Sequence, residues 1–157
     1  METQTDTPWL SDQQQRSWRA FLGGVTVLMD RLDRELRAAH DLSLPEYEIL
    51  VRLSEAPLRT IRMAELADLV ALSRSRLTHT VSRLEADGLV RREACDEDRR
   101  GVQAVLTDHG LDVLGRAADT HVRGVQRHLL AHASPSELSA IGDVMERVIE
   151  ALHGKRF

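Results

Sequence analysis

Aromatic residues are scarce in this 157-residue sequence, at 3% of the chain, so a core must consist mainly of Leu, Val, Ile and Ala. An all-β sandwich usually contains more aromatic and β-branched residues, and the composition therefore favours helices. A single cysteine, Cys95, excludes an intrachain disulfide and a paired-cysteine zinc knuckle. No apolar run approaches the ~18 residues of a membrane span, and the polar N-terminus lacks a signal-peptide profile. We therefore expect a cytoplasmic protein without a membrane segment.

Lysine is also rare, because Lys155 is the one lysine among 21 basic residues. Arginine suits bidentate contacts to phosphate and guanine, although a codon bias toward arginine explains the same count. The net charge of −4 argues mildly against a general DNA coat. Residues 73–84, however, contain three arginines and no acid, and residues 91–100 contain four more arginines mixed with acids. Basic charge is thus concentrated locally, and its distribution matters more than its sum.

Hydrophobic periodicity predicts a mainly helical fold. Apolar residues recur at three- and four-residue steps over 12–40, which predicts a helix too long to bury its whole apolar stripe against one small domain. A partner chain is the simplest cover for that stripe. Ser43 with Glu46 forms a capping box that begins a second helix, which Pro57 ends. Near the C-terminus Thr107 caps a long helix, and a further capping box at 134–137 begins the last one.

The middle of the chain has the pattern of a winged helix-turn-helix. Helices are predicted over 63–70 and 73–87, with a short break at 71–72 and Ser73 as the cap of the second helix. Gly88 ends that helix. Two short strands, over 89–93 and 102–106, then surround a polar loop, which predicts a β-hairpin. The predicted fold is therefore mainly α with a small β-hairpin wing.

Three stretches carry a family resemblance: Met63-Ala-Glu-Leu-Ala-Asp-Leu, then Leu84-Glu-Ala-Asp-Gly-Leu-Val90, then Asp98-Arg-Arg-Gly-Val-Gln-Ala-Val-Leu-Thr107 followed by Gly110. The sequence resembles the multiple antibiotic resistance regulator (MarR) family over nearly its whole length. The D-x-R…L-T…G pattern is the most specific mark. The resemblance implies one domain over 1–157, with dimerisation helices at about 10–42 and 107–153 and a DNA-binding lobe at about 43–106.

The resemblance also implies partners. They are a double-stranded, pseudo-palindromic DNA operator, a second copy of the chain in a homodimer, and a small aromatic or phenolic effector that binds between the dimer base and the lobe. A ligand-responsive repressor is the expected function, and neither an enzymatic activity nor a cofactor is expected. The alternatives are an activator or architectural DNA-binding protein of the same fold, or a helical dimer whose lobe binds protein.

The helix that starts at Ser73 is expected to enter the major groove. Hydroxyl groups can bind phosphates, and arginine can read the O6 and N7 edge of guanine. His79 stands where similar proteins often have arginine, and unperturbed histidine is mostly neutral at pH 7. Arg83, deeper along the helix, is suited either to phosphate or to an internal ion pair. The predicted DNA-binding set on this helix is Ser73, Arg74, Ser75, Arg76, Thr78, His79, Ser82 and Arg83.

The wing supplies the remaining DNA contacts. Arg100 occupies the pattern arginine, and a guanidinium at a hairpin tip can enter a narrow minor groove. Arg99 is the second candidate for the tip. Asp98 would be repelled by DNA and is expected to shape the wing by pairing with an arginine.

Other candidate sites have weaker signals. Trp18, Phe21, His40 and Tyr47 lie on helices that line the effector cavity in similar proteins, although core packing explains Trp18 and Phe21 equally well. No metal site is expected, since solvated surface residues are the preferred interpretation of the late histidines His121, His128 and His132. Cys95 lies near arginines that could activate a thiolate, but acidic neighbours oppose this effect.

Overall fold

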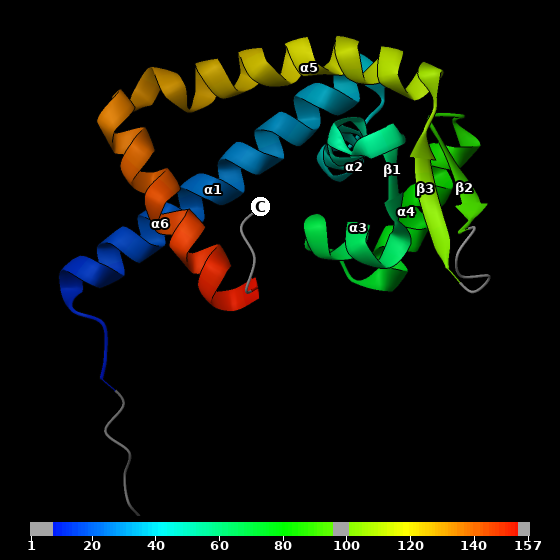
Figure 1. Cartoon of the computed structure of the whole chain (residues 1–157). Helices are drawn as coiled ribbons and strands as arrows, with labels where there is room; N and C mark the ends of the chain where they lie inside the picture. Colours follow the sequence, from blue (N-terminus) through cyan, green and yellow to red (C-terminus); the bar gives the residue numbers. More distant parts are fainter. Residues whose placement is uncertain (1–7, 96–100, 154–157) are drawn as a thin grey trace, which may run out of the picture.

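The computed structural model describes residues 8–95 and 101–153, and the predicted fold class is confirmed: the chain is mainly helical with a small sheet (Figure 1). The elements are α1 (Asp12–His40), α2 (Leu44–Glu55), the 3-10 turn η1 (Pro57–Arg59), β1 (Thr60–Arg62), α3 (Met63–Leu69), α4 (Arg74–Ala86), β2 (Val90–Ala94), β3 (Val102–Leu106), α5 (Asp108–His128), the 3-10 turn η2 (Leu130–His132) and α6 (Pro135–His153).

The elements from α2 to β3 pack together and hold most of the core; we call them the lobe (Figure 1). Each helix turns an apolar stripe inward, and the completely buried leucines include Leu50 of α2, Leu66 of α3 and Leu84 of α4. The capping box at Ser43 and Glu46 forms as predicted, with Ser43 Oγ accepting a bond from the Glu46 N–H at 3.3 Å. The rigid core thus fixes how α4 is presented at the surface.

The sheet contains a strand that the sequence did not predict. β1 pairs antiparallel with β3, with Ile61 opposite Ala104, so the strand order among the described residues is β1-β3-β2. Three residues are too few to show the alternation of a strand, and pairing with distant β3 decides the conformation. The predicted strand over 89–93 lies over Val90–Ala94 instead. Leu89 instead belongs to the Schellman motif that follows α4 around Gly88 (φ 73°), in which the Leu89 N–H donates to Leu84 O at 2.9 Å.

The helices α1, α5 and α6 extend away from the lobe and form an arm; α5 runs from the end of β3 to the outer end of the arm, where α6 turns back (Figure 1). The arm buries little of its own apolar surface. Leu32 and Leu36 are the buried residues of α1, and no described side chain of α6 is buried. Large apolar side chains stay exposed along α1 and α6, among them Trp18, Leu22, Val25, Ile141, Val144 and Val148. No helix of the described ranges is apolar enough over a sufficient length to cross a membrane.

The junction of the wing and α5 explains two residues of the L-T…G pattern. Thr107 Oγ1 accepts a bond from the Gly110 N–H at 2.9 Å and donates to Gly88 O at 2.7 Å. It therefore caps α5 and joins that helix to the end of α4. The backbone at Gly110 lies so close to the backbone at Leu89 that a Cβ atom on residue 110 would lie 2.1 Å from Leu89 O. Only glycine fits there without displacing backbone.

Candidate nucleic-acid interface

The candidate interface begins at the N-terminus of α4. Its cap is Ser73, as predicted, whose Oγ accepts a bond from the Arg76 N–H at 3.3 Å. The turn before it places Ala71 in the left-handed region, with φ 51°. The first turn of α4 contains arginines and no acid, so its unpaired N–H groups face outward without a competing carboxylate.

Burial divides α4 into an inner face, an outer ridge and two flanks. Leu77, Val81 and Leu84 are buried, which turns the ridge of Ser75, His79 and Ser82 outward at the spacing of one helix face. Ser75 and His79 are exposed, and Ser82 is half-buried. The ridge is therefore the part of α4 that can enter a DNA groove furthest, with the arginines on either side of it.

One flank of α4 faces the first turn of α2. Here a hollow of about 190 Å³ separates the helices, and Arg37, Glu46, Arg76, His79 and Arg83 are among its lining residues. Arg83 turns into this hollow: its Nε lies 3.2 Å from Glu46 Oε1, and its NH2 group lies 3.7 Å from Asp41 Oδ1. Of the two uses predicted for Arg83, phosphate contact and an internal ion pair, this structure contains the second.

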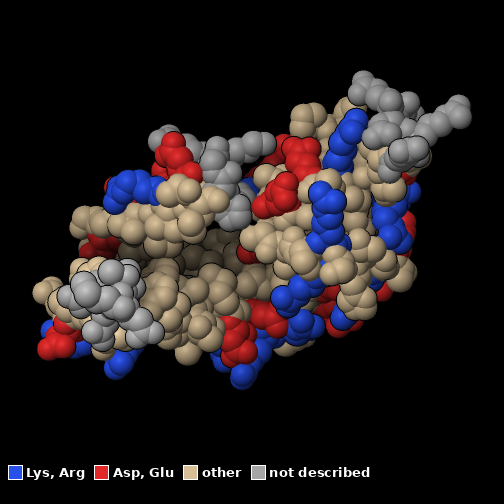
Figure 2. Space-filling model, turned by 90° about the horizontal axis from the view of Figure 1, so that it is seen from below, with Lys and Arg blue, Asp and Glu red and all other residues tan. Residues whose placement is uncertain are grey.

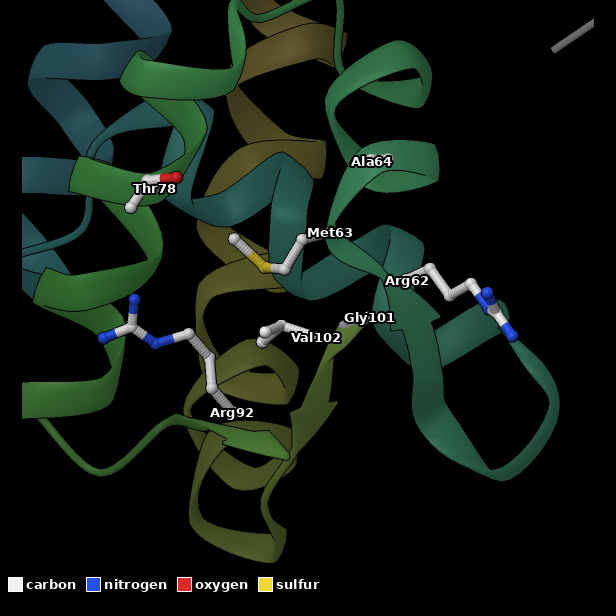
Figure 3. Close-up of a pocket in the computed structure, with 7 residues that line it drawn as sticks. All are labelled: Arg62, Met63, Ala64, Thr78, Arg92, Gly101 and Val102. Carbon is white, nitrogen blue, oxygen red and sulfur yellow. The ribbon is translucent and has the colours of Figure 1, made fainter. Parts of the chain in front are cut away.

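The other flank faces the wing across a crevice of about 440 Å³ (Figure 3). Met63 and Val102 lie in the middle of the crevice, Arg92 reaches toward α4 beside Thr78, and Arg62 points away. Arg92 Nε and NH2 donate to Glu85 Oε2 at 2.9 and 2.6 Å, and the Arg92 N–H donates to Glu85 Oε1 at 2.9 Å. These bonds lower the pKa of Glu85. We call this pair the wing brace, since it ties β2 to α4.

Two of the hydroxyls in the predicted set already donate to their own helix. Thr78 Oγ1 donates to Arg74 O at 2.8 Å, and Ser82 Oγ donates to Thr78 O at 2.9 Å. A phosphate oxygen needs a donor, so these side chains must give up a backbone bond before they can bind one. Arg74 and Arg76 are exposed and offer donors that do not depend on such an exchange.

The charge distribution agrees with an interface on the lobe. On the face shown in Figure 2 the arm, on the left, is mostly uncharged, whereas arginine side chains gather on the lobe side with acidic groups among them. The predicted wing residues Asp98, Arg99 and Arg100 lie outside the described residues. The hairpin that presents them is confirmed by the pairing of β2 with β3, Arg92 opposite Ala104.

The four predicted effector-cavity residues lie in two places. Trp18 and Phe21 stack, with ring centroids 6.1 Å apart, beside the apolar side chains of α6. His40 and Tyr47 lie at the other end of α1, about 30 Å away at 1.5 Å per residue. There His40 Nε2 is 2.8 Å from Thr120 Oγ1. Within one described chain, the four residues therefore do not form one cavity.

The late histidines are not all solvated surface residues, and this part of the sequence interpretation is wrong. His128 Nε2 lies 2.8 Å from Glu35 Oε1, and its side chain is 23% exposed. His121 is half-buried with its ring centroid 4.6 Å from that of Tyr47, and burial lowers its pKa. Packing of α5 against α1 brings His128 to Glu35, and packing of α5 against α2 brings His121 to Tyr47. No local sequence pattern reveals either contact. The described residues contain no cluster of three potential metal ligands.

Cys95 is buried at the end of the wing strand, with 5% of its surface exposed. Its Sγ lies 3.9 Å from Gln103 Oε1 on the neighbouring strand. A reactive thiol needs access to its oxidant, so this burial opposes a sensing role for Cys95.

Helices α3 and α4 form a helix-turn-helix whose second helix, α4, is capped and carries arginines, and the hairpin of β2 and β3 adjoins it. This arrangement defines the class of winged helix-turn-helix regulators. Comparisons with known proteins narrow the class. The MarR family model matches residues 42–102. The regulator PecS of Dickeya dadantii is 31% identical over 86% of this chain and 81% of its own length. Two MarR family regulators of Streptomyces coelicolor are each 40% identical over 95% of this chain: Sco3205, solved in complex with DNA (TM-score 0.90, 93% of its chain), and AbsC (TM-score 0.88, 100% of its chain). The chain belongs to the MarR family of DNA-binding transcriptional regulators, and is not an enzyme.

Sequence reasoning missed the residues that hold α4 in place. Glu85 and Arg92 gave no signal, because seven residues and a chain reversal separate them. Glu46 was recognised as a capping residue, but its pairing with Arg83 depends on how α2 packs against α4. An acidic residue in a capping box, such as Glu46, and an arginine on a recognition helix, such as Arg83, are each common. Only the fold shows that these two form an ion pair.

Proposed function

We propose that the chain is a homodimeric, ligand-responsive repressor that binds a pseudo-palindromic operator with α4 in the major groove and the wing in the minor groove. The observation that carries DNA reading is the outer ridge of α4, Ser75, His79 and Ser82, with exposed Arg74 and Arg76 beside it. Arginine forks suit guanine and phosphate, and small hydroxyls allow the helix backbone to approach the bases. The DNA complex of the 40% identical Sco3205 supports this assignment.

The arm supports the homodimer. Residues at about 10–42 and 107–153 would form the dimer base, and residues at about 43–106 the DNA-binding lobe. Exposed apolar side chains recur on α1 and α6, and none of the described side chains of α6 is buried. An apolar face of this extent on a folded chain normally marks an interface. A second copy fits because a two-fold dimer would present two copies of α4 to one duplex.

Selection of bound sequences from random DNA by the purified protein tests the proposal. We expect two inverted half-sites whose centres lie about one DNA turn, ~10 bp, apart or a multiple of it. A single unrepeated half-site would contradict the dimer. DNA binding that does not weaken as the salt concentration rises would mean that the lobe makes no phosphate contacts. That result would favour the alternative in which the lobe binds protein.

The effector and the sign of regulation need separate tests. We propose a small aromatic or phenolic effector on the basis of the family resemblance, and titration of phenols and aromatic acids into the protein–operator complex should release DNA. A promoter fusion carrying the selected operator should be repressed by the protein and derepressed by the same compound. Activation of the fusion would overturn the repressor assignment and leave DNA binding intact.

A further inference from the structure

Glu46 is buried, with 3% of its surface exposed, although it is charged. Its Oε2 accepts bonds from the N–H and Oγ of Ser43, both at 2.7 Å. Its Oε1 faces Arg83 Nε at 3.2 Å. A buried carboxylate is costly unless it is both hydrogen-bonded and paired, so the position of Arg83 matters to the stability of this corner of the lobe.

Arg83 does not lie on the ridge of α4 that faces outward. It lies on the flank that faces α2, and its side chain is 47% exposed. A second acid, Asp41, which ends α1, approaches its NH2 group at 3.7 Å. The guanidinium is therefore directed toward two carboxylates of neighbouring elements.

The same corner is connected to the last turns of α1. Asp33 Oδ1 accepts a bond from the Leu44 N–H, the first residue of α2, at 2.8 Å, and Asp33 Oδ2 accepts one from Arg37 Nε at 2.6 Å. Burial alone would raise the pKa of Asp33, but these bonds outweigh it and lower the pKa. A continuous set of polar contacts thus runs from α1 through the first turn of α2 to the recognition helix α4.

We propose that Glu46 is a positioning residue for DNA binding: by holding Arg83, it fixes the orientation of α4 relative to α2 and the end of α1. The proposal rests on the proposed function, since α4 must be the reading helix. Any rotation of α4 that moved Arg83 away would leave the Glu46 carboxylate buried without its cation. Bidentate base contacts tolerate little displacement, so a helix held in this way keeps its sequence preference.

The test uses the full chain and the selected operator, with the variants Glu46→Gln, Arg83→Gln and the double variant. Anisotropy titrations at several salt concentrations give affinity for operator and for random DNA, at a temperature where every variant is folded. We expect each single variant to lose about tenfold in operator affinity, or roughly one bidentate base contact, with little loss on random DNA. The double variant should lose no more than either single one. Glu55→Gln, on an exposed position of the same helix, is the matched control and should bind as the unaltered chain does.

The salt slope separates this role from a direct phosphate contact. If Arg83 only positions α4, Arg83→Gln leaves the slope of log Kd against log salt unchanged. A slope reduced by about one in Arg83→Gln would overturn the proposal, and so would tighter binding by Glu46→Gln, because it would mean that Glu46 competes with DNA for Arg83. Hydrogen exchange provides a readout without DNA: Glu46→Gln should exchange the amides of α4 faster than Glu55→Gln does. Equal exchange rates of the α4 amides in the two variants would overturn the role of Glu46. A chain that binds no DNA at all would overturn the proposed function, but the exchange experiment would still test whether Glu46 holds α4.

Discussion

Replacing Gly110 by alanine is expected to destabilise the protein, although alanine normally favours a helix. A Cβ at this position would lie 2.1 Å from Leu89 O, 2.9 Å from Leu89 C and 2.7 Å from Leu106 Cδ1. A carbon–oxygen contact normally requires about 3.3 Å, so backbone must move by about 1 Å. The backbone cannot yield easily, since the Thr107 N–H also bonds to Leu89 O at 3.1 Å.

The expected magnitude follows from two opposing terms. Overpacking of this kind costs about 1–3 kcal/mol and occasionally more, and an alanine in a helix recovers at most about 1 kcal/mol relative to glycine. Because the collision is with backbone, we expect a net loss of about 2 kcal/mol. For a chain of this size that corresponds to a fall in Tm of about 4–8 °C.

Thermal unfolding at one fixed protein concentration measures this effect. The matched control is Gly115→Ala, on the same helix, where no atom lies within 4 Å of the added Cβ. We expect that variant to gain up to about 1 kcal/mol, which gives the two substitutions opposite signs. A Gly110→Ala protein as stable as the unaltered chain would show that the close approach to Leu89 does not exist in solution.

Four further outcomes are expected. Glu85→Gln should remove part of the wing brace and lower the stability to denaturant near neutral pH. Because the pKa of Glu85 is lowered in the folded protein, the stability that this carboxylate contributes is present above its normal pKa of about 4.3. That contribution is lost as the pH falls through the lower folded value. A difference between variant and unaltered chain that persisted in strong acid would contradict this reasoning. His79→Arg should tighten operator binding and steepen the salt slope by about one, measured by anisotropy, whereas an unchanged slope would place residue 79 away from phosphate. Arg100→Ala should weaken binding to all sequences and reduce the slope by about one, and unchanged binding would remove the wing from the interface. Val148→Asp should convert the proposed dimer to monomers in sedimentation equilibrium, because it places a charge in an apolar interface. The control Ser139→Asp, on the same helix, should leave the dimer intact, and a Val148→Asp protein that is still dimeric would place the interface elsewhere.

The sequence was a good guide wherever a local rule determines the structure. The capping residues Ser43, Ser73 and Thr107 placed helix starts correctly, and Gly88 placed the end of α4. These signals work because capping is a contact between residues three or four positions apart.

Contacts between distant segments were less predictable. The strand at Thr60–Arg62 exists because β3 pairs with it, and the partners of His128 and Arg83 are set by helix packing. The inward and outward faces of α4 follow from residue spacing within one helix. The pairings that hold its flanks depend on contacts between distant segments and could not be predicted in this way. The DNA-contacting set as a whole stays a prediction.

The C-terminal helix has a consequence for how the amount of protein in a cell would control its target. α6 contains no buried described side chain, so in the proposed dimer its stability would come largely from association with the second chain. If the chain dimerises as proposed, formation of the arm and formation of the dimer would be one equilibrium, which shifts with concentration. Dilution would loosen the arm and separate the paired lobes together. Occupancy of a two-part operator would therefore rise more steeply than in proportion to the amount of chain synthesised, and the abundance of the regulator would itself be a signal.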